Sequence, residues 1–145
     1  MPGRRGIAKP SKPARRSAPY PFILEALAPL EPEIRPMFSG FAVYAGDKIV
    51  VMLRDSPKYP KDNGVWLIFS EIANLDDPSI RRDFPSLRLI DLLGGKIAHW
   101  RLIPADSSTF ESEALHACDL LLKHDARLGR VPKSRQTRSV RPRRS

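Results

Sequence analysis

The chain has 145 residues, of which 41% are hydrophobic and 28% are charged, and this predicts one globular domain. Its single cysteine, Cys118, excludes an intramolecular disulfide and indicates a reducing compartment. No run approaches the roughly 20 apolar residues that span a bilayer, and the basic N-terminus lacks the apolar stretch of a signal peptide. We therefore expect a cytoplasmic protein with no membrane partner.

The net charge of +9 is concentrated at the two ends of the chain. Residues 1–18 carry six basic residues and residues 126–145 carry eight, and neither segment has an acidic one. Residues 19–125 carry 11 basic and 16 acidic residues. The sequence thus predicts two disordered basic arms, 1–18 and 126–145, around a mildly acidic domain at 19–125.

The first half of the domain predicts a helix followed by three strands. An apolar stripe after Pro21 predicts a helix that prolines end near residue 30. The runs 41–45, 48–54 and 65–69 have strand composition. Turn signals at Gly46-Asp47 and Asn63-Gly64 separate them.

The second half predicts a short helix, a hairpin and a long helix. Asp77 is a good N-cap for a helix running to about Phe84. The runs 87–93 and 97–103 flank Gly94-Gly95-Lys96 as a hairpin would. Ser108–Glu111 has the pattern of a capping box, and one apolar face follows it. That face comprises Phe110, Ala114, Leu115, Cys118, Leu121 and Leu122.

The resulting order, α-β(3)-α-β(2)-α, predicts an α+β domain with two layers and a mainly antiparallel sheet. Strand alternation places Ile49, Val51 and Leu53 on one face of the sheet and Val50 and Met52 on the other. Both faces are thus apolar, so we expect a helix, an arm or another subunit to cover each. A homodimer is one way to cover the second face.

A short motif runs Ile34-Arg35-Pro36-Met37-Phe38-Ser39-Gly40-Phe41, then Val43-Tyr44-Ala45-Gly46-Asp47-Lys48-Ile49. It resembles the N-terminal domain of TfoX/Sxy-type competence regulators. That family opens its sheet with Arg-x-Met-Phe-Gly-Gly-aromatic and a hairpin, and Ser39 stands at its first glycine. The resemblance covers residues 34–54 by motif and 20–125 by element order. It implies the α-β(3)-α-β(2)-α fold and a non-catalytic, regulatory or partner-binding role.

Two groups of residues are candidates for binding a partner. The first is Arg35, Met37 and Phe38, which either form a partner-binding edge or serve the fold, with Met37 and Phe38 in the core and Arg35 paired with an acid. The second lies in a loop that two prolines stiffen, and it either binds a partner or is a solvated connection. It consists of Lys58, Tyr59 and Lys61.

The sequence does not assemble a metal site or a catalytic site. The three histidines have no metal-ligand spacing, and Cys118 has no neighbouring base to activate it. Lys96 is followed by a strand-like run, not by the hydroxyl residue and helix of a phosphate-binding loop. Asp76-Asp77 is explained by helix capping. We therefore expect no cofactor, no metal and no enzymatic activity.

The arms give the alternative function, which is non-specific binding of a nucleic-acid backbone by an accessory protein. Arginine forks suit phosphate oxygens, and neither arm has aromatic residues for base stacking. A solubilising role for the arms is the other interpretation. The candidate residues are Arg4, Arg5, Arg15, Arg16, Arg130, Lys133, Arg135, Arg138, Arg141, Arg143 and Arg144.

Overall fold

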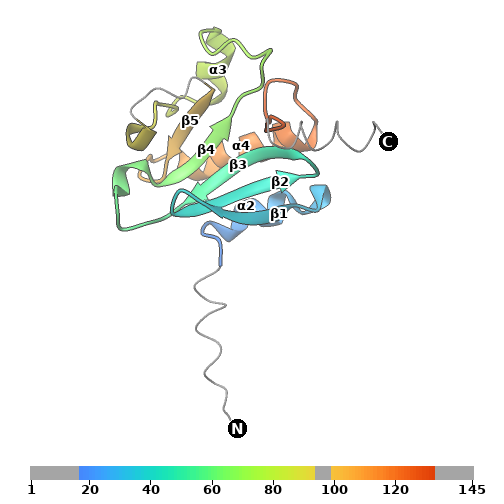
Figure 1. Cartoon of the computed structure of the whole chain (residues 1–145). Coiled ribbons are helices and arrows are strands. Elements are labelled where there is room, and N and C mark those ends of the chain that lie inside the picture. The colour runs from blue at the N-terminus through green and yellow to red at the C-terminus, as the bar shows by residue number, and fades with distance from the viewer. Residues whose placement is uncertain (1–16, 94–98, 133–145) are drawn as a thin grey trace.

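The computed structural model, which describes residues 17–93 and 99–132, is an α+β domain built on one antiparallel five-stranded sheet (Figure 1). This confirms the predicted fold class and, approximately, the order of elements. The strands lie in chain order across the sheet: β1 Glu33–Met37, β2 Gly40–Ala45, β3 Lys48–Arg54, β4 Gly64–Ile68 and β5 Trp100–Pro104. The helices are α2 Pro21–Ala26, α3 Pro78–Asp83 and α4 Phe110–Leu122, and short 3-10 turns cover Ala28–Leu30, Pro60–Asp62 and Asp91–Leu93.

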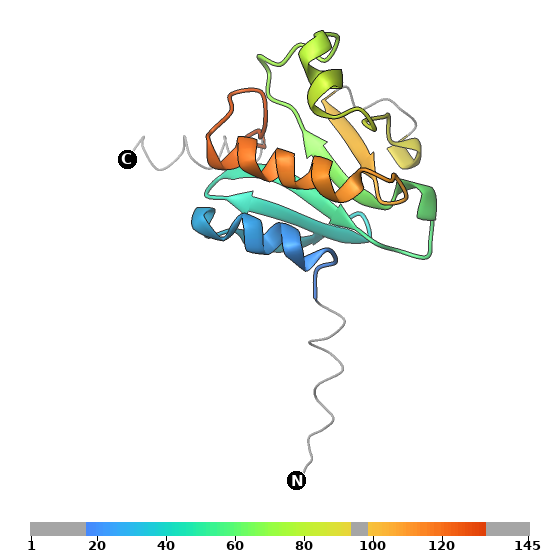
Figure 2. The same cartoon turned by 180° about the vertical axis from the view of Figure 1, so that it is seen from behind.

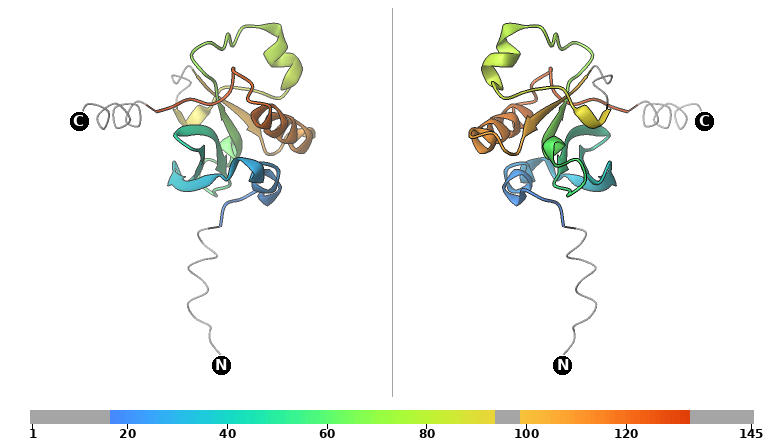
Figure 3. Two further views of the ribbon diagram at one scale, coloured as in Figure 1. Left: turned by 90° about the vertical axis from the view of Figure 1, so that its right-hand side faces the viewer. Right: turned by 90° about the vertical axis from the view of Figure 1, so that its left-hand side faces the viewer.

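Helices α2 and α4 lie side by side on one face of the sheet (Figure 2), and the edge-on views place both on the same side of it (Figure 3). Ile23 from α2 and Cys118 from α4 are buried against Val51 and Leu53 of β3. Asp77 caps α3 as predicted, because its carboxylate accepts the Ser79 amide at 2.9 Å. None of the described helices has the length and apolar character of a membrane span.

A second apolar core lies on the opposite face of the sheet. It comprises Ala42, Ile49, Met52, Trp66, Ile68, Ile90, Trp100 and Leu102. The segment 87–93 covers part of this face, but it is not the predicted strand: it makes a single bridge, Arg88 to Leu102, and ends in a 3-10 turn. The predicted turn at Gly94-Gly95-Lys96 lies outside the described residues.

A β-bulge decides which side chains of β3 face which core. Val43 pairs with Val51 and Tyr44 pairs with Ile49, so Val50 is an extra residue in the ladder. Val50 therefore joins Val51 in the helix-side core, and Ile49 joins the second core. The predicted alternation, with Ile49 beside Val51 and Val50 on the other face, is wrong because strict period two fails at a bulge.

Three further local features differ from the prediction. Residues 33–37, which were not predicted as a strand, form the edge strand β1, whose Pro36 lies at the margin of the sheet where a missing amide is tolerated. The N-cap of α4 is Thr109, which makes no side-chain cap bond, so Ser108–Glu111 is not a capping box. On α4, Leu115 is 42% exposed, and Ala117 takes its place in the core.

The predicted C-terminal boundary at residue 125 is also wrong, because residues 126–132 belong to the domain. Leu128 is buried and bridges Phe69, and Arg130 bridges Ile49. Arg127 makes ion pairs with Asp83 at 3.0 Å and with Asp125 at 2.9 Å. A basic residue in this segment therefore does not mark an arm. Of the predicted N-terminal arm 1–18, Ser17 and Ala18 are described, and Ala18 packs against the helix-side core. The rest of the predicted arms, 1–16 and 133–145, lies outside the described residues.

Truncation should separate the true boundary from the predicted one. Ending the chain at Asp125 removes the buried Leu128 and the ion pairs of Arg127, so the free energy of unfolding should fall by about 2–4 kcal/mol. Ending it at Pro132 should change that free energy by less than about 0.5 kcal/mol. Urea unfolding of both truncations and the full chain measures this, and equal stability of the two truncations would contradict the revised boundary.

The burial of Cys118 makes a second prediction. Its side chain is 2% exposed, its thiol lies 3.9 Å from the Ile23 carbonyl oxygen, and burial raises its pKa to about 11. Cys118→Ala should cost about 1 kcal/mol, whereas Cys118→Asp should prevent folding because it buries an unpaired charge. At pH 7.5 a bulky maleimide should label the native thiol far more slowly than the urea-unfolded one, and equal labelling rates would place the thiol at the surface.

Candidate partner-binding site

One buried arginine at the C-terminal end of β3 organises the turn and the loop next to it. Arg54 is 1% exposed, and no described carboxylate forms an ion pair with it. Its Nε donates to the Phe38 carbonyl at 3.2 Å, and its Nη1 donates to the Tyr59 carbonyl at 2.8 Å. Further bonds run to the Asn63 side-chain oxygen at 2.9 Å and the Lys58 carbonyl at 2.5 Å. We call this guanidinium and its four acceptors the Arg54 hub.

The hub explains an unusual concentration of left-handed backbone. Phe38, Ser39 and Tyr59 have φ angles of 50°, 61° and 52°, a region that side chains other than glycine rarely adopt. Each such residue costs on the order of 1 kcal/mol or more unless its surroundings hold it there. Here the carbonyls of Phe38 and Tyr59 bind the same guanidinium, so the hub holds both turns in these conformations.

The Asn63 side chain and the Tyr20 hydroxyl connect the hub to the surrounding structure. The Asn63 amide accepts from the Ser56 N–H and donates to the Ser56 carbonyl, both at 2.9 Å, which closes the 56–63 loop. The Tyr20 hydroxyl donates to the Arg54 carbonyl at 2.8 Å. Burial raises the pKa of Tyr20 to about 12, with a further contribution from Asp55, so this hydroxyl stays protonated at neutral pH. The loop is thus anchored at both ends.

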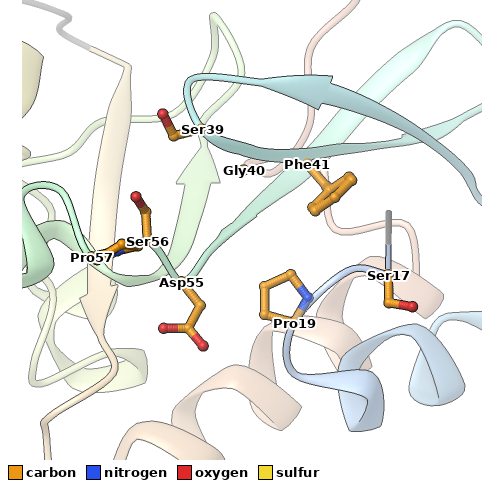
Figure 4. A pocket seen from close by; sticks show the side chains of 8 residues that line it. All are labelled: Ser17, Pro19, Ser39, Gly40, Phe41, Asp55, Ser56 and Pro57. Atoms are coloured by element: carbon orange, nitrogen blue, oxygen red, sulfur yellow. The ribbon is translucent and has the colours of Figure 1, made fainter. Parts of the chain in front are cut away.

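A groove of about 460 Å³ runs beside the hub (Figure 4). In this view the Ser39 and Ser56 hydroxyls point one way, and the Asp55 carboxylate points the opposite way. The Ser56 hydroxyl accepts the Lys58 amide at 3.2 Å. No histidine is among the described residues that line the groove, and the Asp55 carboxylate points away from the Ser39 and Ser56 hydroxyls. Its walls are Ser17, Pro19, Ser39, Gly40, Phe41, Asp55, Ser56 and Pro57.

The two turns that the hub holds both expose an aromatic side chain. Phe38 is 48% exposed, and its ring stacks on the buried Trp66 with centroids 5.8 Å apart. Tyr59 is 58% exposed. Gly40, directly after the first turn, has no room for a side chain, since a Cβ there would lie 2.4 Å from the Leu53 carbonyl oxygen. We call Phe38, Ser39, Lys58 and Tyr59 the aromatic turn surface.

The structure divides the predicted site residues between this surface and structural roles. It brings Phe38, Lys58 and Tyr59 together through the hub. Met37 instead packs against the second core. Arg35 pairs with Glu33 at 3.2 Å, and its guanidinium lies 5.6 Å from the centre of the Tyr44 ring. Lys61 pairs with Asp91 at 3.0 Å, where both side chains are exposed.

Sequence reasoning missed the buried charged residues. Asp62 is fully buried and accepts the Asp91 and Leu92 amides at 3.1 and 2.5 Å, which holds the 3-10 turn at 91–93 in place. Arg54 could have been noticed as the charged residue that ends a strand whose interior, 49–53, is apolar on both faces. Nothing local distinguishes Asp62 from its exposed neighbour Lys61, because its amide partners lie about thirty residues away in the chain.

Other titratable groups form pairs away from this surface. His116 Nε2 lies 3.1 Å from a carboxylate oxygen of Asp83, whose other oxygen pairs with Arg127. Burial opposes ionisation of Asp83, but hydrogen bonds from His116 and Arg127 outweigh it and lower its pKa. Within 17–93 and 99–132, no three histidine, cysteine or acidic side chains come together as metal ligands.

Comparisons with known proteins found no relative of this chain. No protein-family model, no curated protein and no solved structure matches the chain.

Arg54→Met should test whether the hub holds the two turns. The substitution removes the guanidinium donor from three carbonyls and the Asn63 oxygen. The Tyr59 carbonyl keeps the Asp62 N–H and the Asn63 oxygen keeps the Ser56 N–H, so the main loss is at the Phe38 and Lys58 carbonyls. The free energy of unfolding should fall by about 2–4 kcal/mol. Arg54→Lys should be intermediate, because an ammonium group cannot reach all four acceptors. Under native conditions, trypsin should also cut the Arg54→Met protein faster at Lys58 and Lys61 than it cuts the unsubstituted protein.

Arg35→Met is the matched control, since it removes the same charge from an exposed position on β1. It should cost less than about 0.5 kcal/mol. Equal effects of Arg35→Met and Arg54→Met on urea unfolding would show that the hub contributes nothing specific.

Proposed function

We propose that this chain is a non-catalytic regulatory or adaptor domain that binds a protein partner through the aromatic turn surface. The observation that carries this proposal is the Arg54 hub, which holds Phe38 and Tyr59 at the surface from strained backbone. Exposed aromatic side chains dominate the binding energy of many protein interfaces. Strained backbone at a rigid surface is a recognised feature of functional sites.

The surface suits binding because little has to be ordered when a partner arrives. Side chains and loops that become fixed on association each cost free energy. Here the turn backbones are already bound to one guanidinium, and the Phe38 ring already rests on Trp66. Lys58 lies next to Tyr59 and adds a cationic, flexible side chain, so a partner with an acidic or polar rim around an apolar centre fits best.

The motif supports the regulatory part of the proposal. The segment Phe38-Ser39-Gly40, on which the resemblance to TfoX-type N-terminal domains partly rests, is the first turn of the surface. Its glycine is required by the contact with the Leu53 carbonyl. The non-catalytic part is supported by the groove, where the Ser56 hydroxyl accepts the Lys58 amide and the described lining residues include no histidine.

Phosphate-backbone binding by the arms is the alternative proposal, and the uneven charge of the chain favours it. One of its candidate residues has another role in the structure. Arg130 donates to the Phe69 carbonyl at 3.2 Å and lies 3.5 Å from Glu71. The remaining candidates, in 1–16 and 133–145, lie outside the described residues.

Site-specific photo-crosslinking tests the partner-binding proposal. A benzophenone amino acid at position 38 or 59 should crosslink the same protein in cells, and one at Ile72, which is 73% exposed, should not. With that protein purified, Phe38→Ala combined with Tyr59→Ala should weaken binding at least about tenfold.

The control is Leu115→Ala, which truncates an exposed apolar side chain on α4 and should leave affinity unchanged. Melting temperatures of all variants are measured alongside, so that a loss of binding is not a loss of fold. Crosslinks from position 72 alone, or unchanged affinity of the double variant, would reject the aromatic turn surface as the contact.

A further inference from the structure

The second face of the sheet contains a cavity of about 410 Å³ beyond the part that the segment 87–93 covers. We call it the sheet-face cavity. Its floor is apolar and comes from Met37, Tyr44, Ile49, Ile68 and Trp100. The volume lies within the range of small-molecule sites, in which an apolar lining with a few convergent polar groups is the usual composition.

One wall of the cavity carries a partly buried cation, Arg130. The backbone of Arg130 is held by two hydrogen bonds with Ile49, N–H to carbonyl at 3.0 and 2.9 Å. Its side chain is 23% exposed, and its Nε donates to the Phe69 carbonyl at 3.2 Å. The nearest carboxylate belongs to Glu71, 3.5 Å from Nη1, whose side chain is 72% exposed. An ion pair this open to water is weak, so the positive charge of Arg130 is only loosely compensated.

The other titratable group of the wall is His99. Burial lowers the pKa of His99, and Arg130 lowers it further, while Glu71 acts in the opposite direction. The imidazole is therefore neutral at pH 7 and offers a hydrogen bond without charge. Among the described lining residues, two are thus charged at neutral pH: Arg130, which is partly buried, and Glu71, which is exposed to solvent.

We propose that the sheet-face cavity binds a small carboxylic acid with an aromatic or branched aliphatic body. The carboxylate replaces Glu71 at the Arg130 guanidinium, and the body lies on Ile68, Ile49 and Trp100. Charge complementarity selects the acid: a guanidinium with limited water contact binds a carboxylate through parallel N–H donors, and the apolar floor excludes a fully hydrated anion. This site is distinct from the aromatic turn surface and does not depend on its function.

Calorimetry on the full chain tests the proposal with 1-naphthoate and its uncharged isostere 1-naphthamide. Naphthoate should bind one per chain with a dissociation constant of about 10 µM to 1 mM, and naphthamide about tenfold more weakly. Arg130→Met should reduce naphthoate affinity to the naphthamide level and leave naphthamide unchanged. Arg82→Met, which removes the same charge from α3, should change neither.

Glu71→Gln gives the opposite result and keeps the test valid if Arg130→Met fails to fold. Glu71 is exposed, so the fold should tolerate this change, and loss of the competing carboxylate should tighten naphthoate binding about two- to fivefold. Naphthamide binding should not change. Equal affinity for the two probes, or no effect of Glu71→Gln on naphthoate, would overturn the proposal. So would a dimer in sedimentation together with no naphthoate binding, which would assign the face to a second copy of the chain.

Discussion

A single buried guanidinium holds together the end of this domain that carries the aromatic turn surface. Arg54 has no described carboxylate to neutralise it, and its charge is compensated by three backbone carbonyls and one amide oxygen. Burying a charge is unfavourable unless hydrogen bonds replace its hydration, so these acceptors must stay in place for the fold to be stable. The same bonds force two turns into left-handed backbone. The hydrogen bonds of Arg54 therefore both stabilise the fold and determine the shape of the exposed surface.

The β-bulge at Val50 has a comparable effect on the sheet. By adding one residue to β3, it directs Val50 and Val51 toward the helices and leaves Ile49 with Met52 on the other face. The helices cover the first face. On the second face, the segment 87–93 covers only part of the apolar surface, and the sheet-face cavity occupies another part. The second face, which the helices do not cover, therefore keeps a cavity.

The C-terminal segment links these two features to the charge pattern. The sequence predicts residues 126–132 as the start of a basic arm, but both arginines in this segment have partners in the domain. Arg127 pairs with Asp83 and Asp125. Arg130 lies near Glu71 and donates to a backbone carbonyl. Through Arg130 the segment brings a cation to the edge of the second core. The Arg130 guanidinium, which is solvated in the unfolded chain, thus lies in the wall of an apolar cavity in the folded protein.

Local patterns in the sequence determined the α+β class, the strand at 48–54, the Asp77 cap and the apolar face of the last helix in most positions. These follow from interactions between residues close in the chain: periodic burial, turn preference and capping. The sequence also indicated that Phe38 and Tyr59 belong to candidate binding segments, though not that they share a site. Only the tertiary structure decided that Arg54 joins them, that Val50 is the extra residue of a bulge, and that Arg130 lies over the second core. The reason is physical: each of these depends on pairing between segments distant in the chain, and such pairing leaves no periodic signal in the residues themselves.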